Sequence, residues 1–183
     1  MKLKQGLIQI YTGNGKGKTT AAIGLANRAI ASNLNVVIIQ FLKGNYDQKT
    51  IHQNPKIQYK RFGLDHKKYG WLEKDVNGKT KNPYLDKFKE CSKKGWQYTQ
   101  RIIEEEKPDV LILDELNPAL YFELLDIKEI VKTLKNKPPK MEIVVTGRQA
   151  PRELIKLADL VTEMKETKHP YQKGIQARKG IDY

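Results

Sequence analysis

The sequence predicts an α/β fold in which a mainly parallel sheet is covered by helices on both faces. Short apolar runs alternate with segments of helical periodicity along the 183 residues, as is typical of parallel sheets. A glycine-rich turn joins the first apolar run to the first helical segment. A chain of this length can bury such a sheet in one core. We therefore expect residues 1–183 to form a single domain.

Each expected strand is a short apolar run, and each expected helix is a longer segment of helical pattern. Strands are expected at about 5–11, 35–41, 57–62, 110–113, 142–146 and 160–164, and helices at about 21–32, 84–106, 127–135 and 151–158. Asp126 is expected to cap the helix that follows it, with Glu129 three residues on as its capping-box partner.

The segment from about 43 to 83 interrupts this alternation. It is polar, rich in glycine and lysine, and predicts at most one short strand, near 57–62. Long irregular segments inside compact domains are usually functional loops or disordered. We therefore expect an irregular active-site segment here.

The turn after the first strand has the composition of a phosphate-binding loop. Glycines 13, 15 and 17 let backbone N–H groups converge on phosphate oxygens without a clash from Cβ. Lys18 adds a positive charge, Thr19 offers a hydroxyl to Mg²⁺, and the helix N-terminus favours an anion. Thr12 stands where the common pattern has its first glycine. With the alternating pattern, the loop predicts a single-domain P-loop (RecA-like) fold that binds a nucleoside triphosphate.

Two acidic residues follow the apolar run at 110–113. Asp114 and Glu115 are expected at the sheet edge that also carries the loop, because parallel strands share one carboxyl edge. A carboxylate there can bind Mg²⁺ directly or through water. The alternative is a strand-end turn with solvated acids. The spacing does not decide which of the two carboxylates binds the metal.

Other candidate residues are supported by fewer observations. Arg148 follows the strand at 142–146, where it either reaches phosphate or ribose oxygens or is a surface cation, and Arg28 lies on the helix after the loop. Phe62, Tyr69 and Trp71 either pack locally or form one wall of a pocket for a large planar ligand. The three histidines have no metal-ligand spacing.

The net charge of +13 indicates either a lysine-rich solvated surface or an acidic partner such as nucleic acid. The lysines are scattered rather than striped, which favours the solvated surface. One cysteine, Cys91, excludes an intrachain disulfide and indicates a reducing compartment. No run reaches transmembrane length and no signal-peptide core is present, so we expect a cytoplasmic protein that has no membrane partner.

Several strings of the sequence resemble the ATP:corrinoid adenosyltransferases of the CobA/BtuR/CobO type. These strings are TGNGKGKTTAAIGLANRA, LDELN, TGRQAPRELIKLADLVTEM and KHPYQKGIQARKGIDY. The resemblance implies transfer of the 5′-deoxyadenosyl group of ATP to the Co(I) centre of a corrinoid, cobalamin or a precursor, with release of triphosphate. It also implies a homodimer and a reduced flavodoxin-type electron donor.

The resemblance further implies roles for individual residues. Thr19 with Glu115 or Asp114 would hold Mg²⁺ (or Mn²⁺). ATP would lie in the loop with reversed polarity. Phe62 and Trp71 are our candidates for the corrinoid side. The remaining implied nucleotide contacts are Gly13, Asn14, Gly15, Lys16, Gly17, Lys18, Thr20, Arg28 and Arg148.

The chain departs from the family pattern at three places. It begins almost at the first strand, so we expect it to lack the N-terminal extension that covers the site in some members. Pro118 replaces a frequent aromatic residue, and the stretch from Phe62 to Trp71 matches the corrinoid-facing region only loosely. The resemblance therefore supports the nucleotide site more strongly than the corrinoid contacts.

Two other classes of protein share the loop. A RecA-like ATPase that binds nucleic acid would show a basic stripe and hydrolysis stimulated by nucleic acid. A small-molecule kinase would need a base near the acceptor and would release diphosphate rather than triphosphate. The scattered lysines lead us to expect no nucleic-acid partner.

Overall fold

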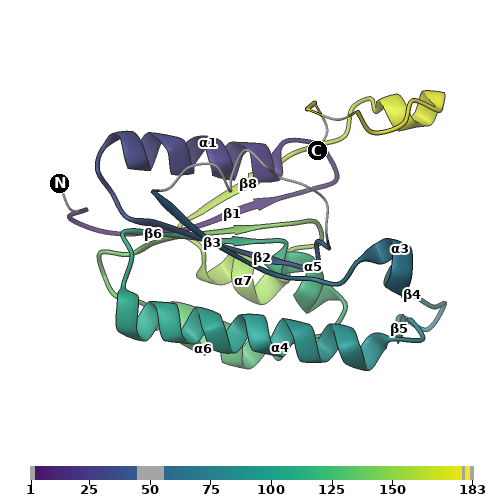
Figure 1. The fold of residues 1–183 in the computed structure, drawn as a ribbon, viewed down its shortest axis with the longest axis horizontal. Coiled ribbons are helices and arrows are strands. Elements are labelled where there is room, and N and C mark those ends of the chain that lie inside the picture. Colours follow the sequence, from purple (N-terminus) through teal and green to yellow (C-terminus); the bar gives the residue numbers. More distant parts are fainter. Residues whose placement is uncertain (1–2, 45–55, 179, 182–183) are drawn as a thin grey trace.

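Six parallel strands form the centre of the structure, a computed structural model that describes residues 3–44, 56–178 and 180–181. The strand order is β3-β2-β6-β7-β1-β8, and every neighbouring pair is parallel (Figure 1). All six strands therefore end at the same edge. Their bounds are β1 Ile8–Thr12, β2 Val36–Phe41, β3 Ile57–Phe62, β6 Val110–Asp114, β7 Glu142–Thr146 and β8 Leu160–Glu163.

Helices cover both faces of the sheet, which confirms the predicted fold class. Helix α1 lies on one face, and α4, α5, α6 and α7 lie on the other (Figure 1). The bounds of these helices are α1 Lys18–Ala31, α4 Leu85–Arg101, α5 Leu116–Tyr121, α6 Ile127–Lys135 and α7 Arg152–Leu157. The smaller elements are α3 His66–Tyr69, β4 Glu73–Lys74, β5 Thr80–Lys81, the π-helical turn Ile102–Glu106 and the 3₁₀ turn Pro170–Lys173.

Strand β2 shows why the sheet must be covered twice. All six of its residues are buried, so neither face can be left to solvent. Val36 and Ile38 pack on the side of α1, and Val37 and Ile39 pack on the side of α4. This alternation follows from the two-residue period of a strand.

The predicted cap of α6 is confirmed, but its capping box is wrong. Asp126 Oδ1 accepts a hydrogen bond from the Lys128 main-chain N–H at 2.9 Å. Glu129 instead accepts from Trp96 Nε1 at 3.1 Å and from Gln100 Nε2 at 3.0 Å. Two donors on α4 therefore take the carboxylate away from its own helix terminus.

The described part of segment 43–83 is more ordered than the sequence predicts. Besides β3 it holds α3 and the antiparallel β4–β5 hairpin. Asp65 caps α3, and Asp75 Oδ1 accepts from two main-chain N–H groups of the hairpin turn, which are both 2.9 Å away. These carboxylate caps supply local order without an apolar pattern. Residues 45–55 lie outside the described residues.

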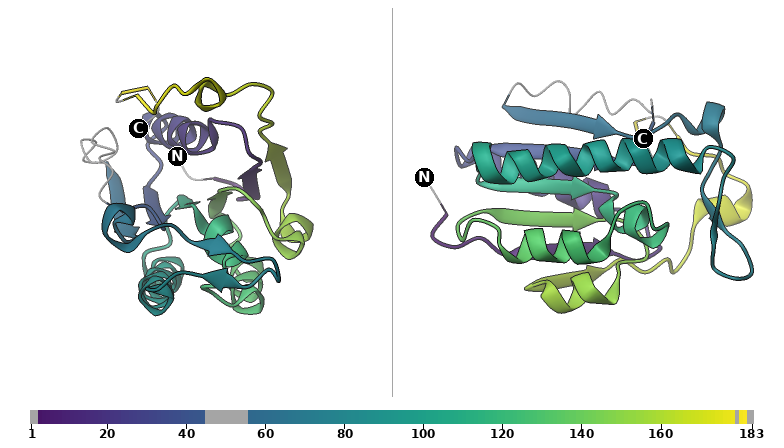
Figure 2. Two further views of the ribbon diagram at one scale, coloured as in Figure 1. Left: turned by 90° about the vertical axis from the view of Figure 1, so that its right-hand side faces the viewer. Right: turned by 90° about the horizontal axis from the view of Figure 1, so that it is seen from below.

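The carboxyl edge of the sheet has additional structure on both sides. Seen end-on, α3 and the β4–β5 hairpin lie on the side of α4, and the C-terminal tail lies on the side of α1 (Figure 2). Within the described residues, no helix is long and apolar enough to cross a membrane.

We expect Leu113→Ala to lower the free energy of unfolding by about 2–5 kcal/mol, because it removes a fully buried side chain from the core between the sheet and α4. Urea denaturation measures this loss. Val76→Ala is the matched control, because Val76 is fully exposed and its truncation should stay within roughly 0.5 kcal/mol of the parent. Equal unfolding midpoints for the two variants would contradict this packing.

Candidate active site

The loop between β1 and α1 depends on its glycines. Gly13 and Gly17 have φ of 95° and 116°, a region that side-chain-bearing residues rarely adopt. Cβ atoms built at Gly13 and Gly15 would lie 2.4 Å and 2.7 Å from the main-chain oxygen of Met164. The Gly15 N–H also donates to that oxygen at 2.7 Å. The chain that leaves β8 therefore packs directly against the loop.

Thr12 explains the missing first glycine. It is still part of β1, so the left-handed conformation falls on Gly13 instead. The Thr12 hydroxyl accepts a hydrogen bond from the Ala150 N–H at 3.3 Å, and its main-chain oxygen accepts from the Met164 N–H at 2.8 Å. Position 12 therefore needs the Thr12 hydroxyl for this hydrogen bond and does not need the conformational freedom of glycine.

Lys18 folds back onto the loop. Its Nζ donates to the main-chain oxygens of Gly13 and Gly15, both at 2.7 Å, and the side chain is buried. Burial lowers the pKa of Lys18, and the nearby positive charge of Arg148 lowers it further. The ammonium therefore lies within the loop, where phosphate oxygens would compete with the two carbonyl groups for it.

Asp114 lies at the centre of a buried hydrogen-bond network. Oδ1 accepts from the Thr146 hydroxyl at 2.6 Å and from the Thr19 hydroxyl at 2.8 Å, and Oδ2 accepts from Gln40 Nε2 at 2.6 Å. Burial alone would raise the pKa of Asp114. The Lys43 ammonium and these three donors outweigh that effect and hold the pKa below its ordinary value.

Lys43 completes this network, although the sequence did not single it out. Its Nζ lies 3.1 Å from Thr19 Oγ1, 3.2 Å from Asp114 Oδ2 and 3.4 Å from Glu115 Oε1. Burial disfavours the ammonium, but the two carboxylates raise the pKa of Lys43 above its ordinary value. Its position directly after β2, at the carboxyl edge, was the available signal.

Glu115 is held by its backbone beside Asp114. Its φ is 60°, and its main-chain N–H donates to the Thr146 hydroxyl at 3.1 Å. Burial and the neighbouring Asp114 carboxylate raise the pKa of Glu115 against the opposing effect of Lys43. The side chain keeps 23% of its exposure, compared with 2% for Asp114. Glu115 is therefore the more accessible of the two carboxylates.

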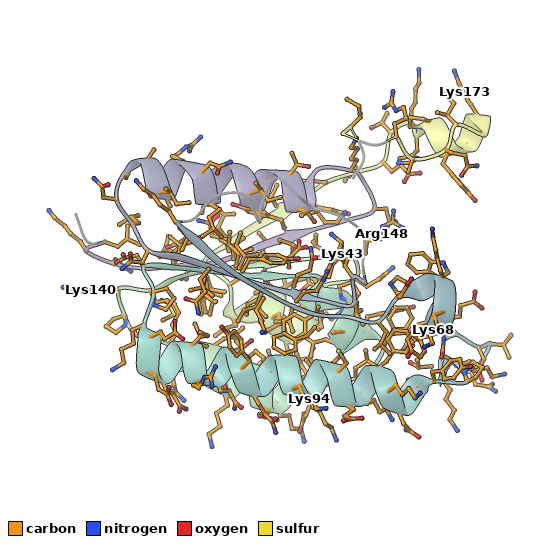
Figure 3. The ribbon with its side chains drawn as sticks, in the orientation of Figure 1. Lys43, Lys68, Lys94, Lys140, Arg148 and Lys173 are labelled. Carbon is orange, nitrogen blue, oxygen red and sulfur yellow. The ribbon has the colours of Figure 1, made fainter. Side chains whose placement is uncertain are left out.

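A tight turn after β7 brings Arg148 to the loop. Arg148 Nη2 donates to the Asn14 main-chain oxygen at 3.3 Å, and Figure 3 labels Arg148 on the same side of the molecule as Lys43. Asn117 Nδ2 donates to the Gly147 oxygen at 3.0 Å, whereas Asn117 Oδ1 has no partner among the described residues. Gly147 has φ of 127°, and a Cβ there would lie 2.2 Å from Pro118 Cδ. Only glycine fits this turn.

The site has the oxygen ligands that Mg²⁺ prefers. Within the described residues, no three His, Cys, Asp or Glu side chains form a metal cluster. Thr19, Asp114 and Glu115 nevertheless bring a hydroxyl and two carboxylates together at the loop. Mg²⁺ at phosphate sites is commonly bound by one or two carboxylates plus substrate phosphates. The residues therefore fit Mg²⁺ bound together with a nucleotide.

The remaining predicted nucleotide contacts, Arg28, Lys16 and Thr20, differ in their positions relative to the loop. Arg28 is in the last turn of α1, about 15 Å along the helix axis from Lys18 at 1.5 Å per residue, and its contact with phosphate or ribose stays a prediction. Lys16 Nζ donates to the main-chain oxygen of Ile181 at 2.8 Å, which links the loop to the C-terminal tail. Thr20 is exposed in the first turn of α1.

The two residues proposed for the corrinoid side have different environments. Phe62 is half-buried and packs on Tyr98 of α4, with ring centroids 5.5 Å apart. Trp71 is 65% exposed and stacks on His66 with centroids 3.8 Å apart. An open pocket of about 750 Å³ includes Tyr69, Trp71 and Tyr84 in its wall. Trp71 is therefore the better placed of the two.

The family of the chain is shown by comparison with known proteins. The family model for ATP:corrinoid adenosyltransferase BtuR/CobO/CobP matches residues 4–183. The chain belongs to this family. A corrinoid adenosyltransferase from Sinorhizobium sp is 36% identical over 98% of this chain and 81% of its own length. The Escherichia coli K12 protein is 31% identical over 98% and 87%, respectively.

Membership of the family identifies the activity as corrinoid adenosyl transfer, with ATP and a corrinoid as substrates. The sequence prediction is thereby confirmed, and neither the nucleic-acid ATPase nor the kinase is needed. Among solved structures, flagellar accessory protein FlaH from Methanocaldococcus jannaschii aligns with a TM-score of 0.49 and 14% identity over 88% of this chain and 72% of its own. That likeness is too low to support an inference.

We expect Gly147→Ala to destabilise the protein by more than Gly78→Ala does. Both glycines have positive φ, at 127° and 75°, so both variants carry a backbone cost of roughly 1 kcal/mol. Only at Gly147 does the new methyl group clash with Pro118. Such overpacking costs about 1–3 kcal/mol more. Urea denaturation compares the two variants, and equal losses of stability would contradict the close contact between Gly147 and Pro118.

Proposed function

We propose that the loop, Thr19 and the acidic pair bind Mg·ATP so that its C5′ carbon faces a reduced corrinoid. Co(I) then supplies the electron pair of the new Co–C5′ bond, the C5′–O bond breaks, and triphosphate leaves with that bond's electrons. The nucleophile loses no proton, so the step requires no general base. The observation that carries the proposal is the convergence of Thr19, Asp114 and Glu115 oxygens beside the phosphate-binding loop.

In this proposal Glu115 and the Thr19 hydroxyl are ligands of Mg²⁺ (or Mn²⁺), and Asp114 orients Thr19. The division is supported by the hydrogen bonds, because both Asp114 oxygens already accept from protein donors. Glu115 has the more exposed carboxylate. The metal ion, when bound, neutralises charge that develops on the leaving triphosphate.

The phosphates would lie along the N–H groups of residues 13–17 and the start of α1. Lys18 would exchange its two carbonyl partners for phosphate oxygens, and Lys16, Thr20 and Arg148 would complete the cradle. Preorganised donors of this kind lower the barrier by stabilising charge on the leaving group. We also propose that ATP lies in the loop with reversed polarity.

On the corrinoid side we propose Trp71, stacked on His66, as an apolar wall, and Phe62, which packs on Tyr98 of α4, as a second contact. The open pocket next to Trp71 supports this placement. A large planar ring system is bound well by exposed aromatic faces. We further propose that residues 1–183 act as a single domain, in a homodimer, in the cytoplasm.

Lys18→Ala should reduce adenosylation roughly a hundred- to thousandfold, because the preorganised positive charge that stabilises the leaving triphosphate is lost. The assay is anaerobic incubation with ATP, Mg²⁺ and a reduced corrinoid, which follows the absorbance of the Co–C product and identifies triphosphate. Lys140→Ala is the matched control, since Lys140 lies at the opposite end of the molecule (Figure 3). Normal kinetics in a folded Lys18→Ala protein would remove the loop from the mechanism.

We also propose that a reduced flavodoxin-type protein supplies the electron for Co(I), and that the net charge of +13 steers this acidic partner. Turnover coupled to flavodoxin should then fall steeply with added salt, as the Debye length shrinks to roughly 8 Å near physiological ionic strength. Turnover with chemically pre-reduced corrinoid should change little. If salt affects both assays equally, the charge does not serve this encounter.

A further inference from the structure

The Lys43 ammonium lies among the oxygens that we assign to the divalent cation. Among the described residues, side-chain oxygens of Thr19, Asp114 and Glu115 lie 3.1–3.4 Å from its Nζ. Thr19 and Glu115 are the two proposed metal ligands, and Asp114 is the residue that orients Thr19. Lys43 therefore supplies a positive charge at the place where Mg²⁺ would supply two.

The two cations cannot share this place. Mg²⁺ requires its oxygen ligands at about 2.0–2.1 Å, and Thr19 Oγ1 lies 3.1 Å from the Lys43 Nζ, so an ion bound to Thr19 and Glu115 would lie within about 5 Å of that ammonium. Like charges at such a distance repel strongly, most of all where the surroundings are largely buried. Binding of the metal therefore requires the ammonium to move.

The main chain of Lys43 is packed against the turn that precedes α3. A Cβ built at Gly63 would lie 2.2 Å from the Lys43 main-chain oxygen, and one at Gly44 would lie 2.5 Å from the Leu64 oxygen. The Leu42 N–H donates to the Phe62 oxygen at 3.1 Å. Glycine at both positions lets the two chain segments touch, so a shift of one displaces the other.

This turn leads directly to Trp71. Asp65 caps α3 through the Lys67 N–H, and His66, the first residue of α3, stacks on the Trp71 ring. Lys43 thus contacts the proposed metal ligands through its side chain and the corrinoid-side segment through its main chain.

We propose that Lys43 takes the place of the divalent cation in the nucleotide-free protein, leaves it when metal and ATP bind, and thereby shifts the turn that carries His66 and Trp71. Loading of the nucleotide site is in this way communicated to the corrinoid side. The proposal rests on the metal site proposed above, and by linkage it is reciprocal: corrinoid bound at Trp71 changes the affinity for metal.

Mn²⁺ binding without nucleotide tests the competition. Free Mn²⁺ is measured by electron paramagnetic resonance during titration of the wild-type protein, Lys43→Met and Lys140→Met. Lys43→Met should bind Mn²⁺ roughly tenfold or more tightly than the wild type, because the competing charge is gone. Lys140→Met, which loses the same charge at the far end of the molecule, should match the wild type (Figure 3). Unchanged affinity in Lys43→Met overturns the proposal.

The metal site itself is tested separately by Glu115→Gln in the presence of ATP. Loss of Mn²⁺ binding in that variant supports the site. If Mn²⁺ and ATP bind Glu115→Gln as they bind the wild type, the proposed ligands are wrong regardless of Lys43. If Glu115→Gln loses the ion but Lys43→Met equals the wild type, only the competition is refuted.

Fluorine NMR of protein labelled with fluorotryptophan tests the link to Trp71. The chain has two tryptophans, and the buried Trp96 serves as an internal reference. Mg²⁺ with a non-hydrolysable ATP analogue should move the Trp71 resonance of the wild type without corrinoid. In Lys43→Met the resonance should start near the loaded position and move little. An equal shift in both proteins overturns the link.

Removal of the ammonium leaves buried Asp114 without its ionic partner, so Lys43→Met is examined with and without Mn²⁺, next to Lys43→Gln, which keeps a hydrogen-bond donor. A variant that folds only when Mn²⁺ is present supports the proposal, since the metal then replaces the ammonium. If neither variant folds even with Mn²⁺, the metal does not substitute for Lys43, and the proposal is refuted.

Discussion

A buried carboxylate at the end of β6 imposes the arrangement of the site. Asp114 is 1% exposed, and a charge removed from water must be matched by donors or by an opposite charge. The donors come from β2, β7 and α1, through Gln40, Thr146 and Thr19. Each of these elements is therefore held at a fixed distance from β6, and the same bonds orient the hydroxyl that we assign to the metal.

This network also limits what the neighbouring residues can do. The Gln40 side-chain amide donates to Asp114, and its carbonyl oxygen accepts from the Tyr59 hydroxyl at 2.6 Å. A chain of hydrogen bonds therefore runs from β3 to β6. Lys43, which follows the same strand as Gln40, brings the opposite charge. Cooperative polar networks of this type are rigid when every member is paired. Glu115, held only by its backbone and Lys43, is left as the adjustable carboxylate.

The sequence predicts the parts of this protein that depend on local pattern. The apolar runs gave strands such as 57–62 and 142–146 with their observed bounds, and the glycines gave the loop. Strand order is not encoded in periodicity, so the adjacency of β2 and β6, which brings Lys43 to Asp114, could not be derived. Helix α5 was missed because it begins after a glutamate with positive φ.

The contact between the loop and the chain beyond β8 has an evolutionary consequence. The carbonyl groups of Met164 and Lys165 lie against Gly13 and Gly15, and the Met164 sulfur lies 3.4 Å from a Cβ built at Gly17. Selection therefore acts on the path of the backbone at both positions, and at Met164 also on a side chain that packs on the loop. Homologous chains should tolerate varied amino acids at position 165 more readily than at 164. Insertions and deletions between β8 and the tail should be purged, because a gain or loss of one residue would move a carbonyl group out of register with the glycines.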